Sequence, residues 1–350
     1  MDLNTFIQTH LLKRSPLSYA LYPSGVLYGY IQKQCRTYSR RRAYRAPCKI
    51  ISIGNIISGG SGKTPLTISL ANLLINKGLK VAVSHRGYKS AFENEPHIIN
   101  ADSGMLYDIH KTGDEAYLIA SALLKVPVAV GRKRVLAVKL LLEKHPSLDV
   151  IILDDALQHN YIHRDLDIIS FDASIGLGNG FVIPAGYLRE PLSNIPQNSL
   201  IIINRKNKAQ TETLWLNKIN QLKIPIYHSS NTPKCFLDIT GNVYPLDYLK
   251  EKRIVLVSGI ANPASFADSV SSVGLSYVKH YACIDHCDFK QPSLIENIFE
   301  LNPDYILCTQ KDIMKLAKYE SLQNRLLALK LEYSFDQEDE FLNQVLNFIK

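Results

Sequence analysis

A glycine-rich run near the start of the chain has the residue types that bind phosphate. Residues 57–64 read ISGGSGKT. The P-loop motif has a glycine, four free positions and then Gly-Lys-Ser/Thr, so Ile57 stands where the leading glycine is expected. Glycines let main-chain N–H groups approach an anion, and the start of a helix favours negative charge. We predict that this run binds ATP through eight residues: Ile57, Ser58, Gly59, Gly60, Ser61, Gly62, Lys63 and Thr64.

A pair of acidic residues follows a predicted buried strand. The segment VIILDD places Asp154 and Asp155 after four apolar residues. In P-loop proteins the lysine reaches the β- and γ-phosphates, while the Ser/Thr hydroxyl and a nearby carboxylate hold Mg²⁺. We therefore assign the phosphates to Lys63, and Mg²⁺ to Thr64 with Asp154 and Asp155. Adjacent side chains of a strand point in opposite directions, so one carboxylate is expected to bind the metal while the other supports the site.

Two further residues are candidates for acting on an acceptor. Asp114 opens a predicted helix, where a carboxylate can act as a base or simply cap the helix. His286 lies between Cys283 and Cys287 in CIDHCDF, a cramped spacing that leaves a zinc site without a fourth ligand. The residue types alone therefore predict a P-loop kinase or ATPase and do not name its acceptor.

Short apolar runs alternate with helical patterns from residue 49 onward, which is typical of a parallel α/β sheet. After about residue 225 a hairpin over 235–252 precedes two further strand–helix units. We predict an α/β fold with a P-loop NTPase-type parallel-sheet domain over 49–229 and a second, smaller α/β domain over 230–350. The predicted strands of the first domain are 49–55, 80–88, 126–131, 148–156, 166–173 and 198–205, and its helices are 65–78, 113–124 and 132–145.

The N-terminal segment over 1–48 differs from the rest of the chain in charge. The chain carries a formal net charge of +8, and residues 1–50 hold nine Lys and Arg against one Asp. The apolar, tyrosine-rich stretch 17–31 is interrupted at Pro23 and is shorter than the ~20 residues of a spanning helix. We predict an N-terminal amphipathic helix that lies on an anionic membrane surface. A core helix followed by a solvated basic loop is the alternative.

The remaining composition excludes several classes of protein. Basic charge confined to one end argues against nucleic acid as a partner. Six cysteines without a C-x-x-C pair suit a reducing compartment better than secretion. The basic residues mainly follow the apolar stretch and no small-residue cleavage site is evident, so a signal peptide is not predicted.

Eight sequence blocks in one order resemble the tetraacyldisaccharide 4′-kinase family, the lipid A 4′-kinases of Gram-negative bacteria. The family's P-loop also lacks the leading glycine, so Ile57 is ordinary for it, whereas Gln310 stands where the family usually has Glu. The blocks are SIGNIISGGSGKTP, SHRGY, TGDEA, LDDALQH, PAGYLREPLS, SGIANPASF, DHCDF and TQKD, between about residues 15 and 318.

The resemblance implies a two-domain enzyme held on the cytoplasmic face of the bacterial inner membrane by its N-terminal segment. It would use ATP and Mg²⁺ to phosphorylate the 4′-hydroxyl of a tetraacyl glucosamine disaccharide 1-phosphate, giving lipid IVA, with no obligate protein partner. Asp114 would be the catalytic carboxylate, and His286 from the second domain would pair with it. Six further positions are expected to line the site: Arg86, Tyr88, Gln158, His159, Arg189 and Glu190.

A membrane-bound partition-type ATPase switch is the main alternative, because its loop also reads Gly-Gly-x-Gly-Lys-Thr. That class has a lysine immediately before the glycines, and this chain has Ser58 there. A GTPase is a weaker alternative, since Asn207 occupies the place of the aspartate in the guanine-binding Asn-Lys-x-Asp motif.

Overall fold

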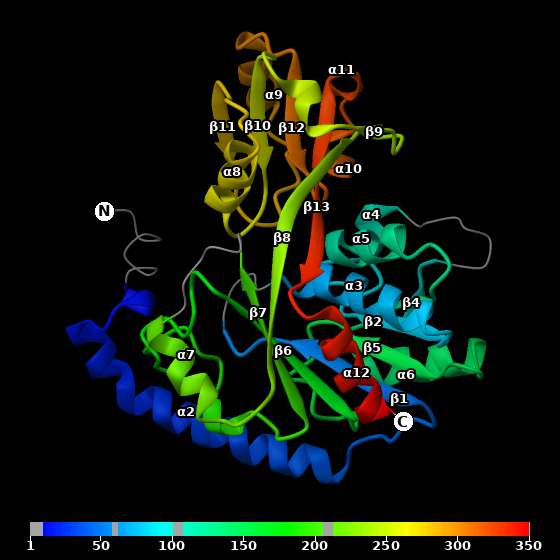
Figure 1. Cartoon of the computed structure of the whole chain (residues 1–350), viewed down its shortest axis with the longest axis vertical. Coiled ribbons are helices and arrows are strands. Elements are labelled where there is room, and N and C mark those ends of the chain that lie inside the picture. Colours follow the sequence, from blue (N-terminus) through cyan, green and yellow to red (C-terminus); the bar gives the residue numbers. More distant parts are fainter. Residues whose placement is uncertain (1–9, 58–61, 101–107, 206–212, 350) are drawn as a thin grey trace.

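The computed structural model describes residues 10–57, 62–100, 108–205 and 213–349. It shows a mixed α/β fold with two lobes, a larger one at the bottom of Figure 1 and a smaller one at the top. One 13-stranded sheet runs through both lobes in the order β11-β10-β12-β13-β8-β7-β6-β1-β5-β2-β4-β3, with β9 paired to β8. The predicted α/β class with a parallel-dominated sheet is confirmed.

The larger lobe holds the predicted parallel sheet. Neighbouring strands among β1 to β7 pair in parallel, except for the antiparallel β3–β4 pair. Strand β1 lies between β5 and β6, so the loops after β1 and β5 meet at one edge of the sheet, where α/β proteins bind ligands. The strands are β1 (Lys49–Gly54), β2 (Val81–His85), β3 (His97–Ile98), β4 (Val128–Val130), β5 (Val150–Leu153), β6 (Leu166–Asp172) and β7 (Ser199–Arg205). The helices are α3 (Lys63–Asn76), α4 (Ile109–Thr112), α5 (Asp114–Ala122), α6 (Arg134–Lys144), η1 (Leu192–Asn194) and α7 (Thr213–Asn220).

The smaller lobe is also built from parallel strands that alternate with helices. Strands β11, β10, β12 and β13 pair in parallel, and separate apolar clusters cover the two faces of this part of the sheet. The predicted hairpin is present, because β8 and β9 pair antiparallel around residues 238–242. The strands are β8 (Ile226–Leu237), β9 (Val243–Tyr244), β10 (Ile254–Ser258), β11 (Lys279–Ala282), β12 (Tyr305–Thr309) and β13 (Leu326–Phe335). The helices are η2 (Leu246–Leu249), α8 (Pro263–Ser272), α9 (Pro292–Glu300), α10 (Ile313–Leu316), α11 (Glu320–Gln323) and α12 (Glu338–Ile349).

Two long strands connect the lobes. Strands β8 and β13 pair antiparallel from Ser229–Phe335 to Leu237–Ala328 and cross from one lobe to the other in Figure 1. The predicted domain boundary between residues 229 and 230 therefore lies within β8. Helix α12 returns to the larger lobe, where Phe341 and Val345 join a core cluster with Leu70 of α3. The domain ranges 1–48, 49–229 and 230–350 stay a prediction.

The N-terminal segment forms helix α2 (Pro16–Arg41), which continues through Pro23 and lies along the base of the larger lobe (Figure 1). Two glycines permit close packing there. A Cβ on Gly25 would lie 2.7 Å from the Val182 carbonyl oxygen, and one on Gly29 would lie 2.9 Å from the Pro191 ring. Within the described part of the chain, no helix has the length and apolar character needed to cross a membrane.

Candidate active site

The phosphate loop begins in a buried apolar cluster. The Ile57 side chain is 3% exposed and packs in a cluster with Leu157 and Leu188, while the Arg189 main-chain N–H donates to the Ile56 carbonyl at 2.7 Å. This packing explains why an isoleucine occupies the position of the motif's leading glycine. Because the Ile57 side chain is buried, this residue could contact ATP only through its main chain. Four predicted ATP-binding residues, Ser58, Gly59, Gly60 and Ser61, lie outside the described residues.

Gly62 ends the loop and caps α3 in the left-handed region, with φ 74° and ψ 24°. A Cβ at this position would lie 2.1 Å from Asn204 Nδ2 of β7. The Asn204 side chain is held in turn, because its Oδ1 accepts a hydrogen bond from Asn231 Nδ2 of β8 at 3.2 Å. Both the backbone conformation and the lack of space therefore require glycine here. Lys63 and Thr64 follow directly in the first turn of α3.

Asp155 lies opposite the P-loop lysine. Lys63 Nζ is 3.6 Å from Asp155 Oδ1, and Asp155 has a φ of 44°, which turns the chain sharply after β5. Its Oδ1 is buried and, among the described residues, receives no hydrogen bond. A carboxylate oxygen in this state suits Mg²⁺, which takes oxygen ligands. Asp155 is therefore the better placed of the two predicted carboxylates to bind a metal directly.

The Asp154 side chain is buried and hydrogen-bonded within the protein. It is 1% exposed, and its Oδ1 accepts hydrogen bonds at 3.0 Å from the Thr67 hydroxyl and from the Asp155 main-chain N–H. Burial raises the pKa of this carboxyl, although the nearby His85 ring opposes the shift. The hydrogen bonds on Oδ1 fix the backbone from which Asp155 projects.

A His–Glu pair, which the sequence does not single out, lies next to Asp154. His85 Nε2 is 3.2 Å from Glu115 Oε2 and 3.8 Å from Asp154 Oδ2. Burial acts to raise the pKa of Glu115, but the hydrogen bond from His85 and the charges of His85, Lys311 and Lys63 outweigh it and lower the pKa to about 2. Glu115 therefore stays ionised and adds negative charge next to Asp154.

Asp114 receives two side chains from the smaller lobe. His286 Nδ1 is 3.2 Å from Asp114 Oδ2, and Lys315 Nζ also hydrogen-bonds to Oδ2. Burial acts to raise the pKa of Asp114, but the bonds from His286 and Lys315 prevail and hold it below the ordinary value. Although Asp114 begins α5, its side chain bonds across the lobe interface, while Gly113 is the N-cap and α5 has no side-chain cap.

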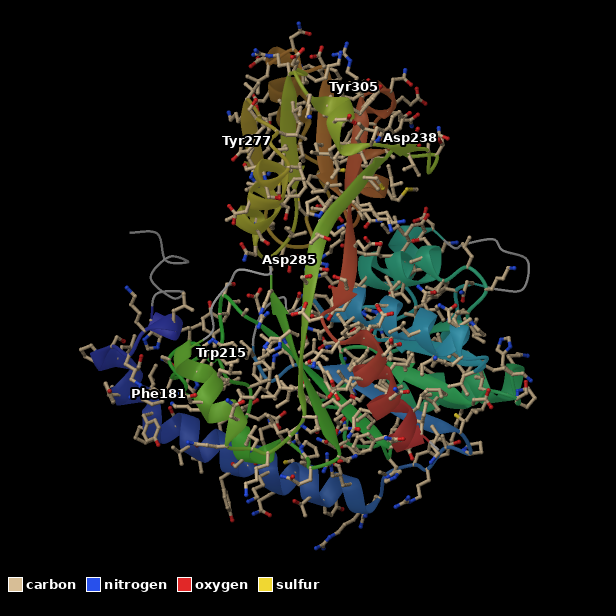
Figure 2. The ribbon with its side chains drawn as sticks, in the orientation of Figure 1. Phe181, Trp215, Asp238, Tyr277, Asp285 and Tyr305 are labelled. Atoms are coloured by element: carbon tan, nitrogen blue, oxygen red, sulfur yellow. The ribbon has the colours of Figure 1, made fainter. Side chains whose placement is uncertain are left out.

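The loop that carries His286 is held by a lysine of its own lobe and faces a tyrosine of the larger lobe. Lys311 Nζ donates to Asp285 Oδ1 at 3.1 Å and lies 3.4 Å from His286 Nε2. The Tyr88 ring of the larger lobe stands 5.9 Å from the His286 ring. Figure 2 labels Asp285 where the smaller lobe meets the larger one. The groups around Asp114 therefore come from both lobes.

Comparison with known proteins agrees with this geometry. A family model described as tetraacyldisaccharide-1-P 4′-kinase matches residues 17–350. The chain belongs to this family. It is 33% identical over 323 residues to the tetraacyldisaccharide 4′-kinase of Syntrophus aciditrophicus, covering 88% of this chain and 86% of that one. It is 34% identical over 307 residues to the kinase of Legionella pneumophila strain Corby, covering 87% and 86%.

A solved structure supports the same assignment. LpxK from Aquifex aeolicus, crystallised with ATP, superimposes with a TM-score of 0.77 at 27% identity, covering 95% of this chain and all of that one. The predicted P-loop kinase fold and the predicted family, an ATP-dependent kinase of lipid A biosynthesis, are confirmed. The partition-type ATPase alternative is not favoured.

Three of the site-lining residues predicted for this family form one hydrogen-bonded group. Gln158 Nε2 donates to the Asn55 carbonyl at 3.0 Å and to Glu190 Oε1 at 3.4 Å, and Arg189 Nη1 donates to Gln158 Oε1 at 3.5 Å. Arg36 of α2 forms an ion pair with Glu190. The loop beside the phosphate site is therefore linked directly to the N-terminal helix.

The remaining predicted site-lining residues are Arg86, Tyr88 and His159. Arg86 is paired with Glu93 at 2.9 Å and lies over the Tyr88 ring. Burial and the charges of Arg134 and Arg86 lower the pKa of His159 to about 4, so its ring is neutral near pH 7. Arg134, which sequence reasoning did not single out, is 2% exposed and donates to the Asp154 carbonyl.

The described structure thus brings the predicted residues into two adjacent groups. Lys63, Asp154 and Asp155 form one, and Asp114 and His286 form the other. Sequence reasoning missed Lys315, Glu115 and Arg134, because no local pattern connects them to the site. Within the described residues no cluster of three or more His, Cys, Asp or Glu is arranged to hold a metal ion.

Proposed function

We propose that the chain transfers the γ-phosphate of ATP to the 4′-hydroxyl of a tetraacyl glucosamine disaccharide 1-phosphate, giving lipid IVA. The observation that carries this proposal is the contact of Asp114 with His286 across the lobes. It supplies a carboxylate held by a histidine in the same site as Lys63 and Asp155. A P-loop binds the phosphates of ATP. A carboxylate outside the P-loop can accept a hydrogen bond from a sugar hydroxyl and so position it.

The phosphate half of the proposed reaction depends on charge and position. Lys63 would contact the β- and γ-phosphates, and the start of α3 would receive their negative charge. Thr64 and Asp155 would hold Mg²⁺, with Asp154 as support, and bound Mg²⁺ neutralises charge on the phosphates. Asp155 Oδ1, which receives no hydrogen bond from the residues that the structure describes, supports this choice of ligand.

The acceptor half orients the hydroxyl. Asp114 stays a carboxylate because its pKa is lowered, so it can accept the hydrogen bond of the 4′-hydroxyl. In a loose phosphoryl-transfer transition state, orientation contributes more than early removal of the proton. His286 already meets Asp114 between the two lobes, and lobes held in contact in this way would exclude water from the reaction.

The exposed face of α2 supports attachment to a membrane. Its buried residues are small or basic, including Ser18, Gly25 and Arg36, whereas large apolar side chains point outward. We infer that this helix lies on the anionic cytoplasmic face of the bacterial inner membrane, with Arg41 and Arg42 near the headgroups. The exposed apolar residues are Leu17, Tyr19, Tyr22, Val26, Leu27, Tyr30, Ile31 and Tyr38.

Membrane attachment is tested by flotation with vesicles of phosphatidylglycerol or phosphatidylcholine. The wild-type chain should float with the anionic vesicles at low salt and less at high salt, because salt screens the arginines. Leu27→Glu, at a position 60% exposed on α2, should reduce flotation, while the control Leu136→Glu, 45% exposed on α6, should not. Equal flotation of all three proteins would refute the role of α2.

The transfer itself is tested with labelled ATP and the tetraacyl disaccharide 1-phosphate. The wild type should form a labelled lipid, and Asp114→Asn should lose on the order of 10²-fold or more in turnover while still binding ATP. Retention of full transfer by Asp114→Asn would reject Asp114 as the catalytic carboxylate. Absence of labelled lipid with the wild type would reject the acceptor.

A further inference from the structure

Asp114 receives both of its side-chain hydrogen bonds on a single oxygen. His286 Nδ1 and Lys315 Nζ both bond to Oδ2. No described side chain or main-chain N–H donates to Oδ1, and this atom is not among the buried atoms that lack a partner. The carboxylate is therefore fixed through one oxygen, while the other is left to meet a group from outside the protein.

Lys315 is an unusual residue at this place because its side chain is only 3% exposed. A buried ammonium group is costly unless charged or polar partners surround it. Here Nζ has two, the Asp114 carboxylate and the Cys287 carbonyl at 3.2 Å. The second contact lies in the loop that carries His286, so Lys315 joins the catalytic carboxylate to the loop that supplies its histidine.

The other charged groups around Asp114 do not replace Lys315. Lys311 is directed to Asp285 and to His286 Nε2, and Glu115 is directed to His85. Tyr88 meets the His286 ring rather than Asp114. Among these groups Lys315 is therefore the lysine in direct contact with the Asp114 carboxylate.

We propose that Lys315 is a positioning residue for phosphoryl transfer, which holds Asp114 as a carboxylate with Oδ1 presented to the acceptor hydroxyl. The inference rests on the proposed function, because it needs Asp114 to be the group that meets the hydroxyl. In the reaction the bond from the acceptor oxygen to the γ-phosphorus forms as the bond from that phosphorus to the β–γ bridging oxygen breaks. ADP leaves with the bridging oxygen, and the hydroxyl proton passes to Asp114 Oδ1.

The burial of Asp114 predicts how the activity of a Lys315 variant should depend on pH. Burial acts to raise the pKa of Asp114, while the hydrogen bonds from His286 and Lys315 and the charges of Lys315 and Lys311 lower it. Removing Lys315 takes away one hydrogen bond and the nearest charge but leaves the burial. The carboxyl should then take up a proton at a higher pH, and the acid limb of the kcat/KM profile should move upward in pH.

The experiment compares Lys315→Met with Lys315→Arg and with Lys318→Met as the matched control. Lys318 lies on the same segment and is exposed, and it donates to the Asp288 carbonyl of the same loop rather than to Asp114. Lys315→Met should lower kcat on the order of 10²-fold, leave the KM for ATP nearly unchanged and shift the acid limb upward. Lys315→Arg should keep the wild-type acid limb with part of the turnover, and Lys318→Met should match the wild type throughout.

A double-mutant cycle separates this inference from the proposed function. If Lys315 acts through Asp114, Lys315→Met should cost almost nothing further in an Asp114→Asn background. Wild-type turnover in Lys315→Met, or a loss with an unmoved acid limb in a protein that still binds ATP, would overturn the role of Lys315 alone. Full transfer by Asp114→Asn would instead overturn the proposed function. Thermal melting of each variant shows whether it is folded.

Discussion

Lys63 and Asp155 come from one lobe, whereas Asp114 and its partners come from two. The phosphate half joins a strand–loop–helix unit to the adjacent strand β5, and parallel pairing of β1 with β5 brings them together. The acceptor half joins residues 172 and 201 positions apart in the chain. The first half therefore depends on the larger lobe alone, and the second depends on how closely the lobes approach. ATP binding should accordingly be less sensitive than transfer to changes at the lobe interface.

The largest effect is expected at Lys63, where the two halves should separate most clearly. Lys63→Ala removes the cation 3.6 Å from Asp155 and should lower turnover on the order of 10³-fold and weaken ATP binding. Asp114→Asn should lower turnover but leave ATP binding intact. Lys77→Ala, at an exposed position just after α3, is the control for both. Isothermal titration with a non-hydrolysable ATP analogue measures the difference, and equal ATP binding by Lys63→Ala and wild type would contradict it.

Asp154 and Asp155, the proposed Mg²⁺ carboxylates, should also differ in their effect on Mg²⁺ dependence. Asp155→Asn removes an oxygen that receives no hydrogen bond from the described residues, so it should raise the Mg²⁺ concentration for half-maximal activity about 10- to 100-fold. Asp154→Asn keeps an oxygen that can accept from Thr67 and should raise it less. A titration of activity against Mg²⁺ decides the order, and a larger effect in Asp154→Asn would exchange the two roles.

Two glycines test whether the end of the phosphate loop depends on its neighbours. Gly62 and Gly78 have φ values of 74° and 83°, but only at Gly62 would a Cβ meet another side chain, that of Asn204. Gly78→Ala should lower the free energy of unfolding by about 1 kcal/mol through backbone strain. Gly62→Ala should lower it further and weaken ATP binding. Denaturant unfolding of both variants measures this, and equal losses would show that Asn204 moves aside freely.

The smallest effect concerns the stability of the lobe interface as a function of pH. The pKa of Asp114 is lower in the folded chain than its ordinary value, so the unfolded chain binds more protons between these two values. The contribution of Asp114 to stability is therefore present above the ordinary value and is lost as the pH falls through the folded one. Asp114→Asn should lower the melting temperature at pH 7, with a smaller difference in acid. A difference that is the same at all pH values would contradict this.

Much of the phosphate half could be predicted from the sequence because its determinants are local. An apolar run, a glycine loop and a helix predict a strand, an anion site and a helix start in order, and the structure places α3 directly after Gly62. The roles of Asp154 and Asp155 were not local. Two adjacent carboxylates look alike in the sequence, and only the contact of Thr67 with Asp154 and the left-handed backbone of Asp155 distinguish them.

Only the fold gives a physical reason for an isoleucine at position 57. Its side chain fills an apolar cluster with Leu188, a residue far along the chain that no local pattern connects to the phosphate loop. Similarly, Pro23 breaks the apolar stretch of the sequence, yet α2 continues through it. The close approach of Gly25 and Gly29 to the larger lobe accompanies this continuity, and tertiary packing of this kind overrides weak local propensity.

By itself the sequence determined the elements of this protein, its family and the residue types of both halves of the site, because periodicity and turn chemistry act over short distances. Only the tertiary structure decided that Lys315 meets Asp114. That contact depends on β8 and β13 pairing antiparallel across the lobes, and on α10 then facing the start of α5. A contact between residues so distant in the chain is set by the order of strands in the sheet, which no local pattern of side chains encodes.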